Sequence, residues 1–134
     1  VGGSNPHYEK LLAAVEKSEV SIELRRNVTN MPELMAWADE AVAAGGSTNW
    51  ELAFMGLPSL GIIVAQNQVE IIETLANQEI ITSLGWHYHT NKESITKAIQ
   101  ATLESFQLRT KMSKKAKELV DGLGSIKVVK QLEF

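Results

Sequence analysis

The amino-acid sequence predicts an α/β fold, in which short strands alternate with helices along the chain. Segments with apolar residues three or four positions apart alternate with short, continuous apolar runs. One of these runs, 60–65, is almost entirely apolar, as expected of a central parallel strand that is covered on both faces. The predicted architecture is therefore a parallel sheet with helices on both faces, which gives three layers.

The first half of the chain is predicted to form three helices and two strands. Asn5-Pro6 predicts the first helix start, because proline favours the first helical position. The alternation of apolar and polar residues that begins at Val20 predicts a half-buried strand. The remaining elements follow from helical spacing or from a short apolar run, and Gly56 is expected to end the third helix. In chain order the elements are a helix over 6–15, a strand over 20–24, a helix over 34–38, a strand over 41–44 and a helix over 52–55.

The second half is predicted to form two strands and four helices. Ile95, Ile99 and Leu103 recur at helical spacing and predict one of the longer helices. Gly122 and Gly124 are expected to break the chain before a last short element, for which a helix is favoured over a strand. In chain order the elements are a strand over 60–65, a helix over 71–75, a strand over 80–82, helices over 95–103 and 110–120, and the final element over 125–132.

Four predicted helix starts share one pattern, in which Asn or Thr stands three residues before Glu. Such a pair predicts a capping box, in which each side chain bonds a free backbone N–H of the first turn. Because the strand-to-helix loops of a parallel sheet gather at one edge, where ligands bind, these starts and the one at Asn5 are expected to line a single rim. The pairs are Asn30 with Glu33, Thr48 with Glu51, Asn67 with Glu70, and Thr90 with Glu93.

Composition narrows the classes of function. The 134 residues are expected to form a single domain with a substantial core. A net charge of −3 gives no reason to expect a nucleic acid or an anionic membrane as a partner. The absence of cysteine excludes disulfides, thiol catalysis and zinc–thiolate sites, and it suits a cytoplasmic protein. The sequence has no signal peptide pattern, and its longest apolar stretch is too short for membrane insertion.

The segment 45–51, Gly-Gly-Ser-Thr-Asn-Trp-Glu, is the strongest candidate for a binding loop. It follows a predicted strand and opens a predicted helix, so free N–H groups and the positive end of the helix dipole would favour a phosphate. Two glycines allow close approach of the backbone. Glu51 lies one helical turn beyond Thr48, within reach of a sugar hydroxyl. The alternative is a plain capping box, which needs one hydroxyl residue and no doubled glycine. The segment therefore suggests a nucleotide-sugar pocket.

Two further loops are expected beside this segment. Asn67-Gln68 follows the strand over 60–65, and amides suit sugar hydroxyls because they donate and accept at once. A capping role for Asn67 and an exposed position for Gln68 would explain the same pattern. The stretch 27–34 would supply backbone groups and an apolar wall to a nucleobase, or it is an ordinary connecting loop. A glycine turn over 2–6 is a weaker candidate for a diphosphate contact.

Other polar residues do not form a catalytic set. His87 and His89 alternate as in a metal-chelating pair, but no third ligand is apparent. We therefore expect no metal or other cofactor there, and favour a strand end or a loop. No pair of nucleophile and base is recognisable, so no catalytic residue is assigned. The lysines over 111–117 have acidic neighbours and predict a solvated helix face.

Several of these segments together resemble one enzyme family. They are 30–35, Ala38-Asp39, 44–51, Gly56-Leu57-Pro58-Ser59, Asn67-Gln68 and Leu84-Gly85-Trp86. In combination, and over the chain from residue 1 to about 122, they are similar to the UDP-sugar hydrolases of pseudaminic acid biosynthesis. That family has a two-domain fold of the GT-B type. It is similar in turn to the peptidoglycan N-acetylglucosaminyltransferase that makes lipid II.

The resemblance implies that the chain is the Rossmann-like C-terminal half of a GT-B enzyme. It implies a fragment without the first strand and helix of that half and without the N-terminal domain, which in the family carries the proposed catalytic histidine. The chain alone is therefore expected to be inactive and to need that domain or a partner chain. The implied substrate-binding residues are Gly45, Gly46, Ser47, Thr48 and Asn49 around the diphosphate, Glu51 at the ribose, Asn30, Met31 and Leu34 at the uracil, and Asn67 and Gln68 at the sugar.

The implied function is to bind a UDP-sugar for hydrolysis to UDP and a 2,4-diacetamido trideoxyhexose. Such a reaction belongs to the biosynthesis of nonulosonic acids and surface polysaccharides. Two alternatives stay open. One is a glycosyltransferase on the same scaffold, with an acceptor hydroxyl in place of water. The other is a non-catalytic subunit that binds a nucleotide-sugar and needs a partner chain.

Overall fold

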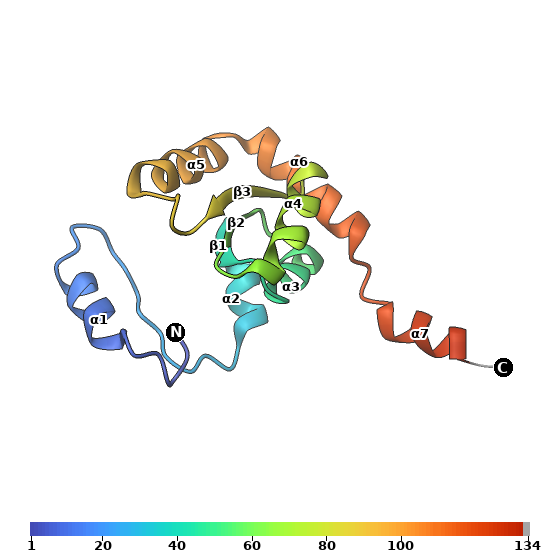
Figure 1. Ribbon diagram of the computed structural model, residues 1–134, viewed down its shortest axis with the longest axis horizontal. Helices are drawn as coiled ribbons and strands as arrows, with labels where there is room; N and C mark the ends of the chain where they lie inside the picture. The colour runs from blue at the N-terminus through green and yellow to red at the C-terminus, as the bar shows by residue number, and fades with distance from the viewer. Residues whose placement is uncertain (133–134) are drawn as a thin grey trace. The chain divides into compact units, whose positions relative to one another are not determined.

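Three parallel strands and seven α-helices form the part of the chain that the structure describes, residues 1–132 of a computed structural model (Figure 1). One short 3-10 helix, η1, stands between β2 and α4. The predicted alternation of strands and helices is confirmed. In chain order the elements are α1 (Tyr8–Glu16), α2 (Met31–Trp37), β1 (Ala41–Ala44), α3 (Thr48–Met55), β2 (Ser59–Ile63), η1 (Gln66–Gln68), α4 (Val69–Asn77), β3 (Ile81–Trp86), α5 (Lys92–Glu104), α6 (Phe106–Leu119) and α7 (Gly124–Leu132).

Two compact units divide the chain, and each is described by itself. The first unit, Val1–Glu33, contains α1 and an irregular segment that follows it. The ammonium group of Val1 donates to the Arg25 carbonyl at 2.6 Å, and the Asn27 N–H donates to the Val1 carbonyl at 3.0 Å. These two bonds tie the segment to the beginning of the chain. The second unit begins at Leu34 and contains the sheet.

The predicted strand over 20–24 is wrong, because this segment has no neighbouring strand. It adopts no regular secondary structure, and the sheet found within residues 1–132 consists of β1, β2 and β3. Val20 is 70% exposed and Ile22 is 49% exposed. The alternation of apolar residues therefore marks no buried face, since a strand also requires a partner whose backbone completes the ladder.

The sheet has the order β1-β2-β3, and both of its strand pairs are parallel. In the central strand β2, Leu60 is 0% exposed and Ile63 is 3% exposed. This confirms the prediction of a buried central strand within 60–65, since an inner strand of a parallel sheet is covered on both faces. β1 and β3 are the two edge strands.

Helices cover both faces of the sheet (Figure 1). Ala41 and Ala43 of β1 pack in a cluster with Leu52 of α3. Val42 points to the opposite face, as alternate residues of a strand do, and there it lines a hollow with Ile99 of α5. The second unit therefore has the three layers that the sequence predicts, with α3 on one side of the sheet and α5 on the other.

Helix α4 lies close against the sheet because two glycines leave room for one isoleucine. Ile72 of α4 is 0% exposed. A Cβ atom placed on Gly45, just after β1, would lie 2.6 Å from Cγ1 of Ile72, and one on Gly61 of β2 would overlap Cδ1 of the same side chain. A larger residue at either position would push the helix away from the sheet.

The helix starts differ from their predicted positions. Helix α5 begins with a capping box one residue later than predicted, in which the Asn91 side chain accepts from the Ser94 N–H at 2.9 Å and the Ser94 hydroxyl accepts from the Asn91 N–H at 3.1 Å. The hydroxyl of the predicted cap, Thr90, instead lies within hydrogen-bond distance of the carbonyls of Leu84 and Trp86. The predicted Thr90 capping box is therefore wrong, because its hydroxyl bonds the end of β3.

The other three predicted capping boxes do not form either. Asn30 donates from its side-chain amide to the Glu33 carboxylate at 2.8 Å, and within residues 1–132 neither side chain accepts from a backbone N–H of the first turn. Thr48 is the first residue of α3, and the preceding cap residue, Ser47, makes no side-chain capping bond. Asn67 lies inside η1, so α4 begins after it. The pattern predicts that a helix starts nearby but not the residue at which it starts.

Element boundaries elsewhere differ by a few residues. α1 begins at Tyr8 and not at Pro6, because the Asn5 side chain accepts from the His7 N–H at 2.8 Å and closes a turn ahead of the helix. α3 begins at Thr48, which the Thr48–Glu51 pair marks as a helix start, although the apolar spacing covers only 52–55. α6 begins four residues before the predicted position, and β3 continues to Trp86. α7 confirms the predicted final helix. Every helix within residues 1–132 is too short or too polar to cross a membrane.

Glu40, which immediately precedes β1, carries a poorly solvated carboxylate. Its Oε1 atom is buried and makes no hydrogen bond within residues 1–132. The Thr102 hydroxyl donates its one proton to the Ala98 carbonyl at 3.1 Å and is therefore not free for this oxygen. Burial raises the pKa of Glu40 above its ordinary value of 4.5, and the positive charge of Arg109 opposes this effect only in part.

Glu40→Gln is expected to stabilise the protein at pH 7, by less than about 1 kcal/mol because solvent still screens much of the side chain. A carboxyl group whose pKa is raised by folding contributes its stability below the unfolded pKa, near 4.5, and loses it as the pH rises through the folded pKa. The gain should therefore be present at pH 7 and absent at pH 3.5. Thermal unfolding at both pH values measures it, with the exposed neighbour Asp39→Asn as a control. An equal gain at both pH values would show that the charge is not the cause.

Candidate functional site

The carboxyl ends of the three parallel strands form the edge at which the candidate site lies. The loops after β1, β2 and β3 all leave this edge, and α3, η1 with α4, and α5 begin from them. Ligands of open parallel α/β sheets bind here, because strand-to-helix loops and helix N-termini converge. The segment 45–51 and Asn67-Gln68 are thus brought to neighbouring loops of one edge, as predicted.

The loop after β1 is held by its own backbone and by one buried side chain. The Gly45 N–H donates to the Ile62 carbonyl at 3.0 Å, and the Gly46 N–H turns back to the Ala44 carbonyl at 2.8 Å. Asn49 is 1% exposed, and its Nδ2 donates to the carbonyls of Ala44 and Gly46, each at 2.9 Å. Asn49 therefore fixes the loop from its buried side, and its Oδ1 has no partner among the described residues.

The start of α3 leaves two backbone donors free for a ligand. The N–H groups of Asn49 and Trp50 bond back to the carbonyls of Gly46 and Ser47, which makes a tight first turn. The N–H groups of Ser47 and Thr48 make no hydrogen bond within residues 1–132, and both residues are exposed. Free donors at the positive end of a helix dipole favour a phosphate group.

The two glycines of this loop have different roles. Gly45 is buried, and a Cβ there would lie 2.6 Å from Cγ1 of Ile72 and 2.8 Å from Cβ of Gln68. Its lack of a side chain is therefore required for packing. A Cβ on Gly46 would meet no atom within 4 Å. A bulky ligand can approach the backbone only where such open space exists, as it does at Gly46.

The residues predicted to face a sugar lie on the next loop. Asn67 is exposed, and it lines a hollow of about 300 Å³ with Trp50 of α3 and Glu70 of α4. The Gln68 side chain accepts from the Val64 N–H at 3.0 Å, so its carbonyl end helps to fold the loop after β2. Trp50 is 44% exposed at this edge. Sequence reasoning missed it, although an indole between two predicted site residues was a usable signal.

The residues predicted to contact uracil surround the start of α2. Asn30 is exposed, Met31 is the first residue of the helix and 44% exposed, and Leu34 is half-buried. The segment is therefore helical from Met31 onward, and the boundary between the two units falls within it. The role of these three residues in binding stays a prediction. Glu51 is exposed on α3, where it takes no part in capping.

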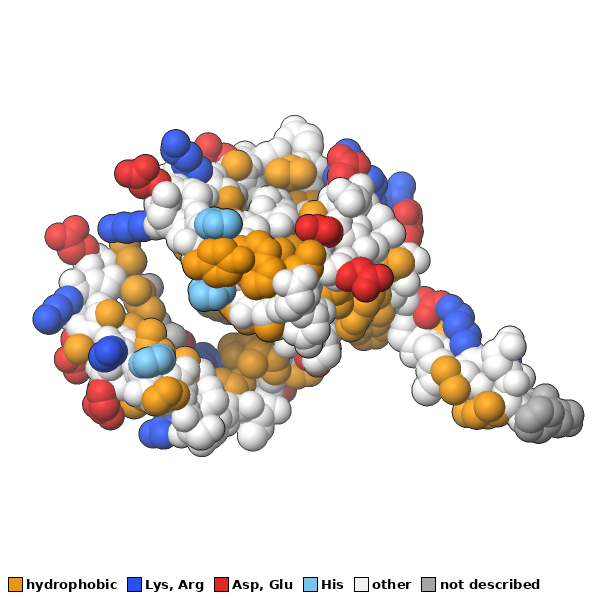
Figure 2. Space-filling view, in the orientation of Figure 1, with side chains coloured by type: hydrophobic (Ala, Val, Ile, Leu, Met, Phe, Trp, Pro, Cys, Tyr) orange, Lys and Arg blue, Asp and Glu red, His pale blue; other side chains and the backbone are white. Residues whose placement is uncertain are grey.

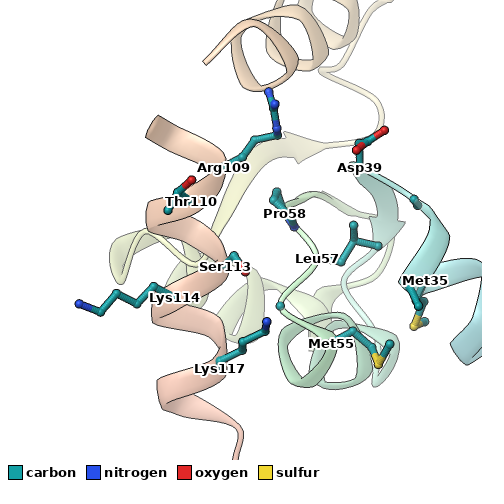
Figure 3. Close-up of a pocket in the computed structure, with 13 residues that line it drawn as sticks. Met35, Asp39, Met55, Leu57, Pro58, Arg109, Thr110, Ser113, Lys114 and Lys117 are labelled. Atoms are coloured by element: carbon teal, nitrogen blue, oxygen red, sulfur yellow. The ribbon is translucent and has the colours of Figure 1, made fainter. Parts of the chain in front are cut away.

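A larger pocket, of about 510 Å³, lies near the amino-terminal ends of the strands (Figure 3). Asp39 and Leu57, which precede β1 and β2, line it together with residues of α6. In Figure 3 the Lys117 side chain points toward the loop that carries Leu57, whereas Lys114 points away from it. This pocket is at the opposite end of the strands from the free donors of Ser47 and Thr48, so size alone does not locate the site.

The other lysines of α6 confirm the prediction of a solvated helix face. The side chains of Lys111 and Lys115 both pair with the carboxylate of Glu79, at 2.5 Å for Lys111, and remain partly exposed. The two ammonium groups lower the pKa of Glu79 to about 2. His87 and His89 lie in the turn after β3, and within residues 1–132 no three potential metal-binding side chains gather at one place.

The chain is similar to two curated proteins that are much longer. It is 29% identical over 133 residues to the spore coat polysaccharide biosynthesis protein SpsG of Bacillus subtilis, an alignment that covers 99% of this chain and 39% of that protein. It is 33% identical over 119 residues to the UDP-N-acetylglucosamine–N-acetylmuramyl-(pentapeptide) pyrophosphoryl-undecaprenol N-acetylglucosamine transferase of Sulfurimonas denitrificans, which covers 85% of this chain and 32% of that protein. No family model and no solved structure matches the chain.

These relatives support a GT-B glycosyltransferase-like family. The three-stranded parallel sheet with its flanking helices fits a Rossmann-like half of such a fold, so the predicted fold class is confirmed. The chain spans about a third to two fifths of the length of these two relatives.

Proposed function

We propose that the unit beginning at Leu34 binds a UDP-sugar at the carboxyl edge of its sheet. The observation that carries this proposal is the pair of N–H groups of Ser47 and Thr48 at the start of α3, which make no hydrogen bond within residues 1–132 and belong to exposed residues. They would hold the diphosphate, with Gly46 leaving room for it. Glu51 would bind the ribose, and Asn67 with Gln68 would face the sugar. The name of one relative refers to polysaccharide biosynthesis, and the name of the other contains a UDP-sugar. Both names agree with a nucleotide-sugar as the ligand.

The reaction that we propose for the whole enzyme is hydrolysis at the anomeric carbon. The bond between C1 of the sugar and the oxygen of the diphosphate breaks, and its electron pair stays on UDP. The oxygen of a water molecule bonds to C1 and loses its proton to a base, which gives UDP and a free 2,4-diacetamido trideoxyhexose. The N–H groups of Ser47 and Thr48 would stabilise the negative charge that develops on the leaving diphosphate. The base would come from an N-terminal catalytic domain or from a partner chain.

Transfer to an acceptor hydroxyl is the second candidate, and one relative favours it because its name describes an N-acetylglucosamine transferase. The leaving group and the role of the loop after β1 would be the same in both reactions. The two reactions would differ in the molecule that attacks C1, which is water in hydrolysis and a hydroxyl compound in transfer. A third candidate is a non-catalytic subunit that holds the nucleotide-sugar for a partner chain.

Titration of the ¹⁵N-labelled chain with UDP tests the binding site. We expect the amide signals of Gly46, Ser47 and Thr48 to shift, with smaller shifts over 30–34. The dissociation constant is expected on the order of millimolar, because half of a site loses contacts but still bears the entropic cost of association. Uridine serves as the control, since it lacks the diphosphate and should leave Ser47 and Thr48 unchanged. If several millimolar UDP shifts none of these amides, the proposed site is wrong.

Glu51→Ala separates a binding role from a structural one. Because Glu51 takes no part in capping α3, the free energy of unfolding should change by less than about 0.5 kcal/mol. UDP binding should weaken roughly tenfold, as expected when hydrogen bonds to a charged group are lost. Glu93→Ala, in the first turn of α5, is the matched control and should leave binding unchanged. Equal effects of the two variants on UDP binding would argue against a ribose contact at Glu51.

A further inference from the structure

The turn that follows β3 carries four consecutive residues with rings, Trp86-His87-Tyr88-His89. None of them takes part in the proposed binding of the diphosphate or the ribose. They lie at the carboxyl end of β3, on the same edge as the loop after β1. The rings of Trp86 and Tyr88 are stacked, with centroids 5.2 Å apart and an angle of 26° between their planes. The imidazoles of His87 and His89 stand edge-on to Tyr88, at 5.2 and 4.6 Å.

An irregularity in β3 orients the first of these rings. The pairing of β2 with β3 shifts by one residue, since Gly61 pairs with Ser83 and Ile62 pairs with Gly85. Leu84 is thus the extra residue of a bulge, and a bulge reverses which face of the sheet the following residues point to. Gly85 has a φ of +73°, and a Cβ on it would meet no atom within 4 Å. It is therefore the backbone conformation and not lack of space that favours glycine at this position.

Hydrogen bonds then fix the turn to the end of the sheet. The Thr90 hydroxyl approaches the carbonyls of Leu84 and Trp86, at 3.1 and 2.8 Å. The His87 N–H donates to the Ile63 carbonyl of β2 at 2.9 Å. One part of Trp86 packs against the hydrophobic core, which holds the base of the stack. The rings therefore lie on a turn that is fixed on both sides; Trp86 is half-buried, and His87, Tyr88 and His89 are exposed.

The stack presents an exposed aromatic surface. Tyr88 is 60% exposed, and His87 and His89 are exposed as well. Figure 2 shows two histidine side chains on either side of an apolar area on the visible face of the molecule. When an apolar ligand surface covers a large ring that folding has left in water, the removal of apolar area from water contributes favourable binding free energy. The phenol, indole and imidazole groups at the rim add donors and acceptors of hydrogen bonds.

We propose that Trp86, His87, Tyr88 and His89 form a platform that binds a pyranose ring. The proposal rests on the proposed function, because it takes the sugar to be that of the nucleotide-sugar held at Ser47 and Thr48. The C–H face of a pyranose is apolar and packs on aromatic rings, while its hydroxyls require mixed donors and acceptors at the edge. β3 is two strand spacings from β1, roughly 10 Å. The sugar would therefore sit at Tyr88 when its diphosphate is at the loop after β1.

Free N-acetylglucosamine, at up to about 100 mM, is the first probe, because it needs no diphosphate site. In NMR spectra of the 134-residue chain we expect it to shift the indole N–H of Trp86 and the amides of His87–Thr90. Tyr88→Ala should weaken this binding roughly tenfold, and Tyr88→Phe should restore most of it. Trp37→Ala, which removes a ring that is 82% exposed elsewhere in the same unit, is the control and should have no effect. If the amides of the turn do not shift, or if Trp37→Ala has the same effect, the platform is refuted.

Comparison of UDP with UDP-N-acetylglucosamine separates this proposal from the proposed function. The wild-type chain should bind the UDP-sugar more tightly than UDP, and Tyr88→Ala should abolish the difference without changing the affinity for UDP. If Tyr88→Ala weakens the binding of UDP as much as the binding of UDP-N-acetylglucosamine, the rings hold the nucleobase and the sugar platform is wrong. If UDP fails to bind while free N-acetylglucosamine still shifts the turn, the proposed diphosphate site is wrong and the sugar contact stands.

Discussion

Replacing Ile72 with alanine is expected to lower the free energy of unfolding by about 2–5 kcal/mol. Ile72 is 0% exposed, and its side chain fills the space that Cβ atoms of Gly45 and Gly61 would otherwise occupy. Because two of its neighbours are glycines, no side chain of theirs can move in to fill the cavity left by the substitution. The loss should therefore fall in the upper part of the range.

Urea denaturation measures this change. Glu73→Ala is the matched control, since Glu73 is the next residue of α4 and is exposed. It should change the free energy of unfolding by less than about 0.5 kcal/mol. A loss below 1 kcal/mol for Ile72→Ala would mean that α4 settles onto the sheet without this side chain, and that the glycines are not required for its position.

Gly45→Ala is expected to destabilise the protein by about 1–3 kcal/mol, whereas Gly46→Ala should leave its stability nearly unchanged. The difference arises because a Cβ on Gly45 would lie 2.6 Å from Cγ1 of Ile72, whereas one on Gly46 would meet nothing within 4 Å. UDP binding should behave in the opposite way. Gly46→Ala should weaken it in a folded protein, because the methyl group would enter the space reserved for the diphosphate.

Thermal unfolding and UDP titration of both variants check this prediction. The combination of Gly45→Ala with Ile72→Ala provides the internal control, since the smaller side chain makes room for the new methyl group. The double variant should lose less stability than the sum of the two single changes, by about 0.5–3 kcal/mol. Additive losses would show that the methyl group of Gly45→Ala is resisted by Gln68 instead, which lies 2.8 Å from it. Equal stability losses at both glycines would refute the division of roles.

The regular part of the fold could be predicted from the sequence because it depends on local patterns of apolar residues. The run that contains Leu60 fits a covered strand, and the spacing of Ile95, Ile99 and Leu103 fits one face of a helix; the structure has β2 and α5 at these places. The segment 20–24 shows the limit of this reasoning. Its alternation is as regular as that of a strand, but strand formation depends on a partner elsewhere in the chain.

The candidate site could be predicted in its position but not in its detail. The doubled glycine, the hydroxyl residues and the loop after β2 do meet at one edge of the sheet. The sequence could not show that Gly45 serves packing, because that follows from the position of Ile72 on a separate helix. The sequence could not show that the Asn49 side chain donates to two backbone carbonyls. It also could not show that a bulge at Leu84 changes the direction of the rings that follow.

The unequal bonding of the three strands has a consequence for motion. β2 is bonded to a strand on each side, whereas the one strand bonded to β1 within residues 1–132 is β2. Amide hydrogens of β2 should therefore exchange with solvent only when the whole unit opens, and those of the outer side of β1 should exchange through small local openings. The loop after β1 is joined to the slower strand through the bond from Gly45 to Ile62. Its backbone donors can thus keep their places while the edge beside them fluctuates.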